Sequence, residues 1–375
     1  MVANFNPEQL TLLRERVGIT KEELAFQCGV SRRTVTSWEN GEVTAPAVDV
    51  LAKVFDVDQQ FFSRSSPQAL DPSRVSFRAL SSLGARKTKR VLAAARLSLQ
   101  FNSWLDEHFS TPAADLPSID DLVAPQDSND VSPAEVARLL RAAWGLGDRP
   151  LRNITTLLER HGIRIMSVPA EDRDVDAFSF WTNGRPFVFL STEKSAERLR
   201  FDLAHETGHL VLHKGLCTAR ERRYELEANH FASAFLMPSD GLVAQVATSP
   251  GRLRMQDVLV MKKSWRVSAA AMVRRLFDLQ LIGEWHYRTW MIDLSSQGYR
   301  RSEPDGLQRE QSLLISTVLV ETRKSGMTLE DIADDCGVPK DTIEQALLGL
   351  ALVPLGGPRR RPPDEFVGVD ALTAE

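Results

Sequence analysis

The chain has 375 residues and a net charge of −4, with 43% hydrophobic and 26% charged residues. This length allows two or three domains with sizeable cores, and the composition is that of an ordinary soluble protein, not of a general nucleic-acid binder. Cys28, Cys217 and Cys336 are far apart and lack C-x-x-C spacing, which predicts no disulfide framework and a reducing compartment. The N-terminus has no signal-peptide core and no apolar run approaches about 18 residues, so we expect a cytoplasmic protein without a membrane partner.

The first 62 residues are predicted to form a bundle of short helices. A first helix runs from Pro7 to Val17, and a second, Lys21 to Cys28, begins with a capping box at Thr20. Gly29 interrupts the chain before a third helix, which Ser31 caps and which reaches Trp38. Two short helices joined by a glycine-containing turn predict a helix-turn-helix.

This motif resembles the XRE, phage-repressor-like family. The residues that carry the resemblance are Leu24-Ala25, Gly29-Val30-Ser31, Thr34-Val35 and Trp38-Glu39-Asn40-Gly41. The resemblance implies double-stranded DNA as a partner, with Arg32, Arg33, Thr36 and Ser37 in the major groove and Lys21 near a phosphate or a base edge. Two arginines suit guanine, which they contact through bidentate hydrogen bonds.

The charge of this module departs from what DNA binding needs. Residues 1–62 hold six basic and nine acidic side chains, a net charge of −3. Because phosphate contacts supply most of the affinity for DNA, a protein-binding or dimerising role stays open beside DNA binding.

The next segment reverses this balance and is predicted to connect two domains. Lys89 to Phe109 forms an amphipathic helix, and a basic cluster, Arg86 to Arg90, stands at its start. Cations at a helix N-terminus oppose the helix dipole, so we expect a counter-charge. DNA phosphate is one candidate, and an acidic patch of the same chain or of a second subunit is the other. Residues 111–132, with three prolines, are predicted to form a linker.

Helices and a small sheet are expected next. Ser132-Pro133 opens a helix to Trp144, and a second helix runs from Asn153 to His161. Short strands follow at 163–168, 177–181 and 186–190, and the turn Thr182-Asn183-Gly184-Arg185 joins the last two as a hairpin. The phenylalanines of these strands are interpreted as core residues. The edge of such a sheet can hold an extended peptide by main-chain pairing.

The motif H-E-x-x-H stands in the apolar helical segment Arg200 to His213. Helical spacing places His205 and His209 one turn apart on one side, where two imidazoles can share a tetrahedral metal ion. Glu206 is placed to reach a water on that metal. Two surface histidines are the alternative, but an unligated His-Glu-His cluster in an apolar helix would be costly to bury.

The third ligand is sought in the following helix, Glu225 to Met237, which Pro238 ends. Glu225 and Glu227 are about 200° apart around the helix and cannot both face the metal. Glu227 shares the apolar side with Phe231, so we predict Glu227 as the ligand and keep Glu225 as the alternative. His213 is expected to support the site without binding the metal.

The two helices together resemble the ImmA/IrrE metallopeptidases. The resemblance rests on Phe201-x-Leu-Ala-His-Glu-x-Gly-His-Leu-x-Leu-His213, on Glu225-x-Glu-Ala-Asn-x-Phe-Ala-x-x-x-Leu-Met-Pro238 and on the later segments 263–268, 272–276 and 279–282. It implies a gluzincin-like peptidase that cleaves a helix-turn-helix repressor and relieves transcriptional repression. It supports His205, His209 and Glu227 as ligands of Zn²⁺, or of Mn²⁺, and Glu206 as the catalytic base. An oxyanion donor is expected among His213, Tyr224 and His230.

The C-terminal third is predicted to hold more helices, a short β-like patch at 287–292 and a mobile tail. Seven residues between Thr328 and Thr342 repeat the helix-turn-helix residues at a constant shift of 308 positions. The arginine pair is lost there and acids replace it, so we interpret this repeat as a helical docking module and not as a second DNA reader.

The expected fold is mainly α with a small β-sheet, an α+β zincin-like domain joined to an all-α helix-turn-helix domain. The expected domains are the helix-turn-helix domain at 1–66, a basic connector and linker at 67–130, the metallopeptidase domain at 131–295, a C-terminal helical module at 296–355 and the tail at 356–375. The predicted function is a metal-dependent regulatory endopeptidase that acts on a repressor, with a homodimer as one arrangement. The alternative is a DNA-binding regulator whose zincin-like domain senses a ligand or a partner without proteolysis.

Overall fold

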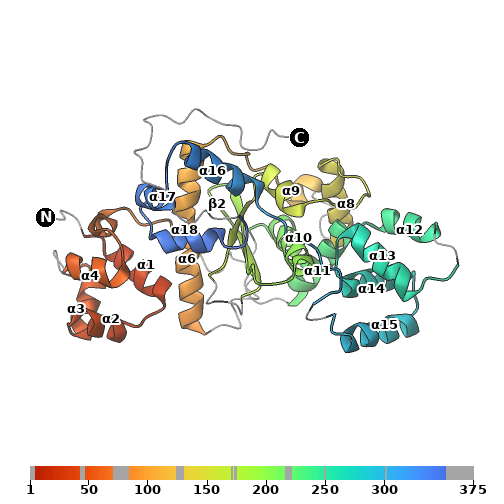
Figure 1. The fold of residues 1–375 in the computed structure, drawn as a ribbon, viewed down its shortest axis with the longest axis horizontal. Helices are drawn as coiled ribbons and strands as arrows, with labels where there is room; N and C mark the ends of the chain where they lie inside the picture. Colours follow the sequence, from red (N-terminus) through yellow and green to blue (C-terminus); the bar gives the residue numbers. More distant parts are fainter. Residues whose placement is uncertain are drawn as a thin grey trace.

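The computed structural model describes residues 5–42, 47–70, 84–123, 131–169, 172, 175–215, 222–248, 251–299 and 302–351. Helices dominate, and one three-stranded sheet lies near the middle of the molecule (Figure 1). The expected fold class, mainly α with a small sheet, is confirmed. The expected tail at 356–375 and Cys217 lie outside the described residues. None of the described helices combines the length and the apolarity that a membrane span requires.

The N-terminal domain lies at one end of the molecule and is built from short capped helices (Figure 1). Its elements are α1 (Pro7–Val17), α2 (Lys21–Cys28), α3 (Arg32–Glu39), α4 (Val48–Phe55) and the 3-10 helix η1 (Gln59–Ser63). Thr20 and Glu23 form the predicted capping box, and Gly29 ends α2 in the left-handed region with φ 68°. The Ser31 hydroxyl accepts a hydrogen bond from Thr34 N, as expected for an N-cap. The predicted helix-turn-helix is therefore present.

Helix α6 (Ala85–His108) connects this domain to the sheet, and the structure shows which groups pair with the basic residues at its N-terminus. Arg86 donates to Gly18 O and pairs with Glu23, and Lys89 Nζ lies 3.0 Å from Glu15 Oε1. Arg90 pairs with buried Asp172, which its Nε contacts at 2.9 Å. Of the two predicted counter-charges, the structure therefore selects acidic side chains of the same chain. These ion pairs also explain why a net-negative helix-turn-helix domain packs against α6.

The sheet separates two hydrophobic cores. Its strands are β1 (Arg164–Ser167), β2 (Ala177–Thr182) and β3 (Arg185–Leu190), in the order β1-β3-β2. β3 pairs parallel with β1 and antiparallel with β2, and the predicted hairpin turn holds Asn183 and Gly184 at positive φ. The strand phenylalanines stack on one face and belong to the core shared with α6, while Val188 and Leu190 of the other face belong to the second core. The interpretation of the phenylalanines as core residues is confirmed.

On the second face of the sheet, α9 (Ile154–Arg160) and α10 (Ala196–Leu212) contact the strands, and α8 (Pro133–Ala143) and α11 (Arg222–Leu236) pack on α10. Gly208 allows the close approach of α10 and α11. A Cβ at this position would lie 3.0 Å from the Phe231 ring and 3.3 Å from Ala228 Cα, so any side chain would push the two helices apart. The predicted linker is partly ordered, because α7 (Ile119–Leu122) and buried Leu116 pack on this domain.

A second helical group lies at the opposite end from the helix-turn-helix (Figure 1). It consists of α12 (Ser239–Ala247), α13 (Met255–Trp265), α14 (Ala269–Asp278) and α15 (Glu284–Ser296). The prediction of a β-like patch at 287–292 is wrong, because these residues lie within α15. Trp290 and Leu294, four positions apart, are both buried where α15 packs on α14. This packing outweighs the preference of the aromatic and branched residues around them for a strand.

Several helix junctions in the described part of the chain share one turn geometry, and three of them join pairs of α-helices through a valine. α2 is joined to α3, α13 to α14, and α17 (Leu329–Cys336) to α18 (Lys340–Leu347) through a left-handed residue followed by a valine. In each turn the valine N–H donates to the carbonyl five residues earlier. α17 also begins with a capping box, at Thr328, as α2 does at Thr20, but the same turn bond ends α1, α4 and α14, so the repeat at 328–342 stays a prediction. The third unit buries Ile343 completely, and α18 packs against α6 and β1, so one face of its second helix is covered by the core.

Buried charges hold the C-terminal module, α16 (Leu313–Lys324) to α18, on the central domain. Glu310 pairs with Arg200 and accepts from Thr155 N at 3.0 Å. Glu159 accepts from Leu313 N at 3.0 Å, at the N-terminus of α16. Burial raises the pKa of Glu159 to about 7, although the donors at this helix end favour its charged form. The module is therefore an integral part of the core.

Candidate metal centre

The candidate site lies between α10 and α11, which run antiparallel. His205 contacts Asn229, and His209 lies against Glu225, so residues that are later on one helix face residues that are earlier on the other. α10 is anchored at its start, where the Ser195 hydroxyl accepts from Arg198 N. The H-E-x-x-H motif lies in the regular part of α10, and His205 and His209 are one turn apart, as predicted.

His205, His209 and Glu225 form a compact triangle of ligand atoms. The two Nε2 atoms of the histidines are 3.1 Å apart, and each lies 3.4 Å from an oxygen of the Glu225 carboxylate. Tetrahedral zinc with bonds of about 2.0–2.1 Å separates neighbouring ligand atoms by roughly 3.3–3.4 Å. Among the described residues, these three together can hold a metal ion, and the spacing of their ligand atoms fits zinc.

Glu227, which the sequence analysis places at the metal, lies elsewhere. Its carboxylate accepts from His213 Nε2 at 2.9 Å and from Arg223 Nε at 2.6 Å. The buried face of α11 is centred on Ala228 and Ala232, and the two glutamates flank this face on opposite sides. Glu225 is on the flank toward His205 and His209, and Glu227 is on the flank toward the end of α10. The structure therefore brings the alternative, Glu225, to the histidine pair.

Hydrogen bonds around the triangle orient both histidines. His205 Nδ1 lies 3.1 Å from Asn229 Oδ1, and His209 Nδ1 lies 3.0 Å from His213 Nδ1. With each Nε2 lone pair directed at the triangle, the proton of each ring sits on Nδ1 and is donated outward. His213 then accepts at Nδ1 and donates from Nε2 to Glu227. This assignment needs a neutral His213, in agreement with burial, which lowers the pKa of His213 to about 4.

The electrostatics of the triangle favour a cation. Burial raises the pKa of Glu225, but hydrogen bonds and charges from His205 and His209 outweigh it and hold the pKa well below its usual range. Burial lowers the pKa of His205, and the bond to Glu225 with the charges of Glu206 and Asp202 reverses this and raises the pKa. The raised pKa of His205 reflects the negative charge of the carboxylates around it, and the lowered pKa of Glu225 keeps this carboxylate ionised, the form that binds a metal ion.

Glu206 is buried next to the first histidine and points at the sheet. Its Oε2 accepts from the Ser179 hydroxyl at 2.6 Å, which ties the carboxylate to strand β2. A second hydrogen bond joins the same strand to α10, because Trp181 Nε1 donates to Leu210 O at 3.1 Å. The predicted base is therefore held between the helix and the edge strand of the sheet.

Two segments of the chain match described families. Residues 158–277 match the IrrE N-terminal-like domain, and residues 10–58 match a helix-turn-helix family. The chain carries an IrrE N-terminal-like domain. The match contains the whole H-E-x-x-H helix and both glutamates of α11. The search of curated proteins returned no match to this chain.

The remaining predicted residues lie in two places. Around the IrrE-like site, the Tyr224 ring packs on His213 at 4.6 Å between centroids, and His230 is an exposed residue of α11. In the helix-turn-helix domain, Lys21 pairs with Glu39 at 2.9 Å and Ser37 donates to Glu42 at 2.8 Å. The Thr36 hydroxyl donates to Arg32 O at 3.0 Å. Arg32 and Arg33 are exposed, and α3 lies on the outside of the domain (Figure 1).

Two supporting residues, Asn229 and Ser179, were not predicted. Asn229 follows Glu225 by four residues, the same spacing that joins His205 to His209. Because both pairs have the same helical spacing, the sequence alone could have indicated that Glu225 faces the histidine pair. Ser179 had no such signal, because only the packing of β2 on α10 brings it to Glu206.

Proposed function

We propose that the protein is a metal-dependent endopeptidase that cleaves a helix-turn-helix transcriptional repressor. The observation that carries the proposal is the triangle of His205, His209 and Glu225 within an IrrE N-terminal-like domain, with Glu206 beside it on the same helix. The alternative is a DNA-binding regulator whose IrrE-like domain only senses a ligand or partner. Glu206 favours the enzyme, because a sensor needs the three ligands and not a buried carboxylate next to them.

In this proposal the three ligands hold a zinc or manganese ion, with Asn229 and His213 fixing the histidine rings. When bound, such an ion would supply Lewis-acid chemistry that polarises a carbonyl and makes water more acidic. Glu206 takes the proton of the attacking water and returns it to the leaving amine. Ser179 orients Glu206 for both transfers. His213 uses both ring nitrogens in other bonds, which leaves Tyr224 and His230 as the proposed oxyanion donors.

Strand β2 is the proposed support for an extended substrate. It forms one edge of the sheet, and its other side pairs with β3 over six residues. β2 also packs along α10, so a peptide that pairs with its open edge would pass Glu206. This arrangement supports an endopeptidase, because an extended chain can continue in both directions past the cut.

Metal removal tests the proposed peptidase activity. The purified chain, loaded with zinc, is expected to cut one of the helix-turn-helix proteins encoded beside its gene, and dialysis against a chelator is expected to abolish cleavage. Zinc added back should restore it, since the ligands are held by the fold. Gel and mass-spectrometric mapping of the fragments gives the cleavage site. Cleavage at an unchanged rate after verified metal loss would contradict the proposal.

The second predicted property is specific binding to duplex DNA through α3. Arg32→Ala or Arg33→Ala is expected to cost ~1–3 kcal/mol at a duplex selected by the wild type from a random pool, and to blur its sequence preference. The salt dependence should be shallow, because Arg86, Lys89 and Arg90 are used in ion pairs and neutralise no phosphate. Fluorescence anisotropy at several salt concentrations measures both quantities.

Arg288→Ala is the matched control for this experiment. Arg288 is an exposed arginine of α15, at the opposite end of the molecule from α3 (Figure 1). Its loss should leave DNA affinity unchanged. A wild-type protein that retains no duplex at low salt, while it still cleaves its target, would show that the helix-turn-helix recognises protein.

A further inference from the structure

The hydrophobic core of the helix-turn-helix domain continues into the rest of the chain. One cluster of buried, contacting side chains joins this domain to α6, to the phenylalanine face of the sheet and to the C-terminal module. Its members include Leu10, Leu24, Val35 and Leu51 in the helix-turn-helix domain, Val91, Leu97 and Phe101 in α6, Phe178 and Phe189 in the sheet, and Ile315, Val318 and Ile343 in the C-terminal module. Domains move relative to each other unless their interface is large and apolar. The shared core therefore fixes the helix-turn-helix domain in the molecule.

Polar contacts with the C-terminal module reinforce this core. Arg16, at the end of α1, has a side chain that is only 8% exposed, and its Nη2 lies 2.7 Å from Asp341 Oδ2 of α18. Arg64, directly after η1, donates to Asp334 O of α17 at 2.8 Å. In addition, α1 packs along α6. The helix-turn-helix domain is thus held by α6 and by the C-terminal module together.

The side of α3 that is expected to read DNA points away from this core. Val35 of α3 is buried in the core, while Arg32 and Arg33 of the same helix are exposed. α3 lies at the outer end of the molecule, away from the sheet (Figure 1). A duplex bound to α3 would therefore leave the shared core intact.

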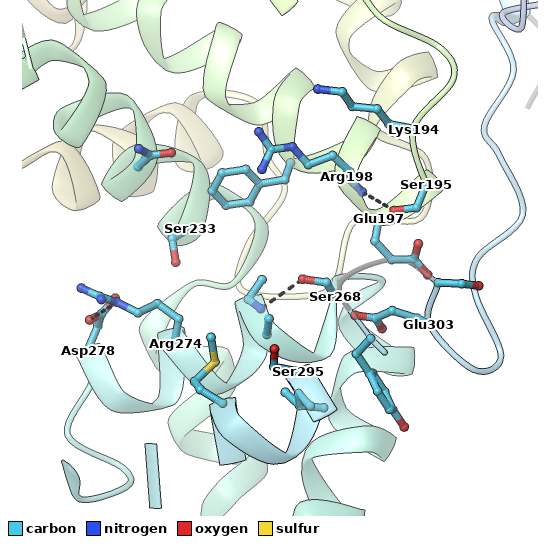
Figure 2. Close-up of a pocket in the computed structure, with 18 of the residues that line it drawn as sticks. Lys194, Ser195, Glu197, Arg198, Ser233, Ser268, Arg274, Asp278, Ser295 and Glu303 are labelled. Atoms are coloured by element: carbon cyan, nitrogen blue, oxygen red, sulfur yellow. Dashed lines mark hydrogen bonds and ion pairs between the residues drawn. The ribbon is translucent and has the colours of Figure 1, made fainter. Parts of the chain in front are cut away.

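The space beside the metal triangle is separate from the helix-turn-helix domain. A cavity of about 800 Å³ lies there, between α10 and α11 on one side and α14 and α15 on the other (Figure 2). Asn229, which contacts His205, lines this cavity. All the described residues that line it lie between Glu193 and Glu303. DNA on α3 and a polypeptide at the triangle would thus occupy different parts of one rigid molecule.

A fixed reading helix gives the bound protein a defined orientation on DNA. The persistence length of duplex DNA is about 150 bp, so a spacer of ~10–40 bp behaves as a stiff rod. A second protein on that rod turns around its axis once in about 10.5 bp. The metal triangle, which is fixed relative to α3, would face this neighbour at some spacings and be turned away from it at others. A peptidase on a flexible linker would show no such dependence.

We infer that the protein cleaves its repressor while both are bound to one DNA duplex, with the metal centre held in a fixed direction by the shared core. The inference rests on the proposed peptidase function and on DNA binding by α3, and it adds the place where the reaction occurs. The reaction itself is the hydrolysis of one peptide bond by one water molecule. Two proteins on neighbouring sites have a high local concentration, so cleavage on the duplex should outpace cleavage of free repressor.

The test uses the zinc-loaded full chain, the repressor that the metal-removal experiment identifies, and duplexes that carry one binding site for each protein. The sites are those that the two proteins select from random pools, and the spacer between them is lengthened from ~10 to ~40 bp in steps of about 2 bp. Gel densitometry gives the initial rate of cleavage at low-nanomolar protein concentration.

The rate on a joint duplex is expected to exceed the rate with the two sites on separate duplexes at least about tenfold. It should also rise and fall with spacer length, at least about threefold, with a period of about 10.5 bp.

Two variants show whether α3 supplies the anchor. Arg33→Ala should lower the ratio of the joint to the separate rate at least about fivefold, because it weakens the hold on DNA. Arg323→Ala, the matched control, removes an exposed arginine of α16 and should leave the ratio unchanged. The ratio corrects for any difference in the cleavage rate itself. A ratio that Arg33→Ala leaves intact would overturn the inference, because α3 would not be the anchor.

The outcomes separate the inference from the proposed function. Equal rates on joint and separate duplexes would overturn cleavage on DNA, and a joint advantage without periodic variation would overturn the fixed direction. Either result leaves the peptidase standing. Failure of the wild type to bind any duplex would overturn the inference in the same way. Absence of cleavage in every mixture, with the zinc content verified, would overturn the proposed function as well.

Discussion

Glu206→Gln is expected to bind zinc like the wild type and to lose cleavage by roughly 10²–10⁴-fold, the usual contribution of a general base. The amide keeps the shape of the side chain and can still accept from Ser179, which contacts Glu206 at 2.6 Å. It cannot take a proton from the attacking water. The three proposed ligands are untouched, so metal content and thermal unfolding should not change.

Two comparisons sharpen this experiment. Glu135→Gln makes the same change at a glutamate of α8 outside the site and should leave the rate unchanged. His209→Ala should instead lose both metal and activity. Full activity of Glu206→Gln would exclude the proposed mechanism and favour a role of the domain as a sensor.

The two glutamates of α11 are expected to respond differently to the same substitution. Glu225→Gln should lower zinc affinity by more than about 100-fold, because it removes the charged ligand of the triangle. Glu227→Gln should change it little, because the amide oxygen still accepts from His213 Nε2, 2.9 Å away in the wild type. Competition with a fluorescent zinc chelator measures both affinities. A larger loss for Glu227→Gln than for Glu225→Gln would restore Glu227 as the ligand.

Removing the hydrogen bonds behind the ligands should have an intermediate effect. Glu227→Ala or His213→Ala is expected to weaken zinc binding ~10–100-fold with one metal still bound at saturation, since His209 loses the partner that orients its ring. Recovery in Glu227→Gln, with loss in Glu227→Ala, would separate this orienting role from a mere packing defect. An empty site in His213→Ala at saturating zinc would mean that His213 is itself a ligand.

The ion pairs of α6 change how the net negative charge of the helix-turn-helix domain is interpreted. Glu15 and Glu23 meet Lys89 and Arg86, and Glu8 meets Arg96. Much of the negative charge of the domain is therefore directed at its own chain, whereas α3 keeps Arg32 and Arg33 exposed. A charge count over residues 1–62 underestimates the positive character of the surface that would face DNA.

Features that depend on neighbouring residues could be predicted from the sequence alone. The capping box at Thr20, the left-handed Gly29 and the hairpin turn at Asn183-Gly184 are set by local backbone preferences and short hydrogen bonds. The alignment of His205 with His209 follows from the period of the helix. The residues that 328–342 shares with the helix-turn-helix are visible in the sequence as a pattern, and the repeat they suggest stays a prediction.

Other features were decided only by the tertiary structure. Which glutamate of α11 faces the histidines depends on the rotation of that helix against α10, which Gly208, Ala228 and Phe231 set by contact. The partners of the basic start of α6 and the helical state of 287–292 depend on elements distant in sequence. So does the cavity, whose walls come from four helices. The physical reason is common to all of them: packing selects one relative placement of elements, and local sequence encodes each element but not its neighbours.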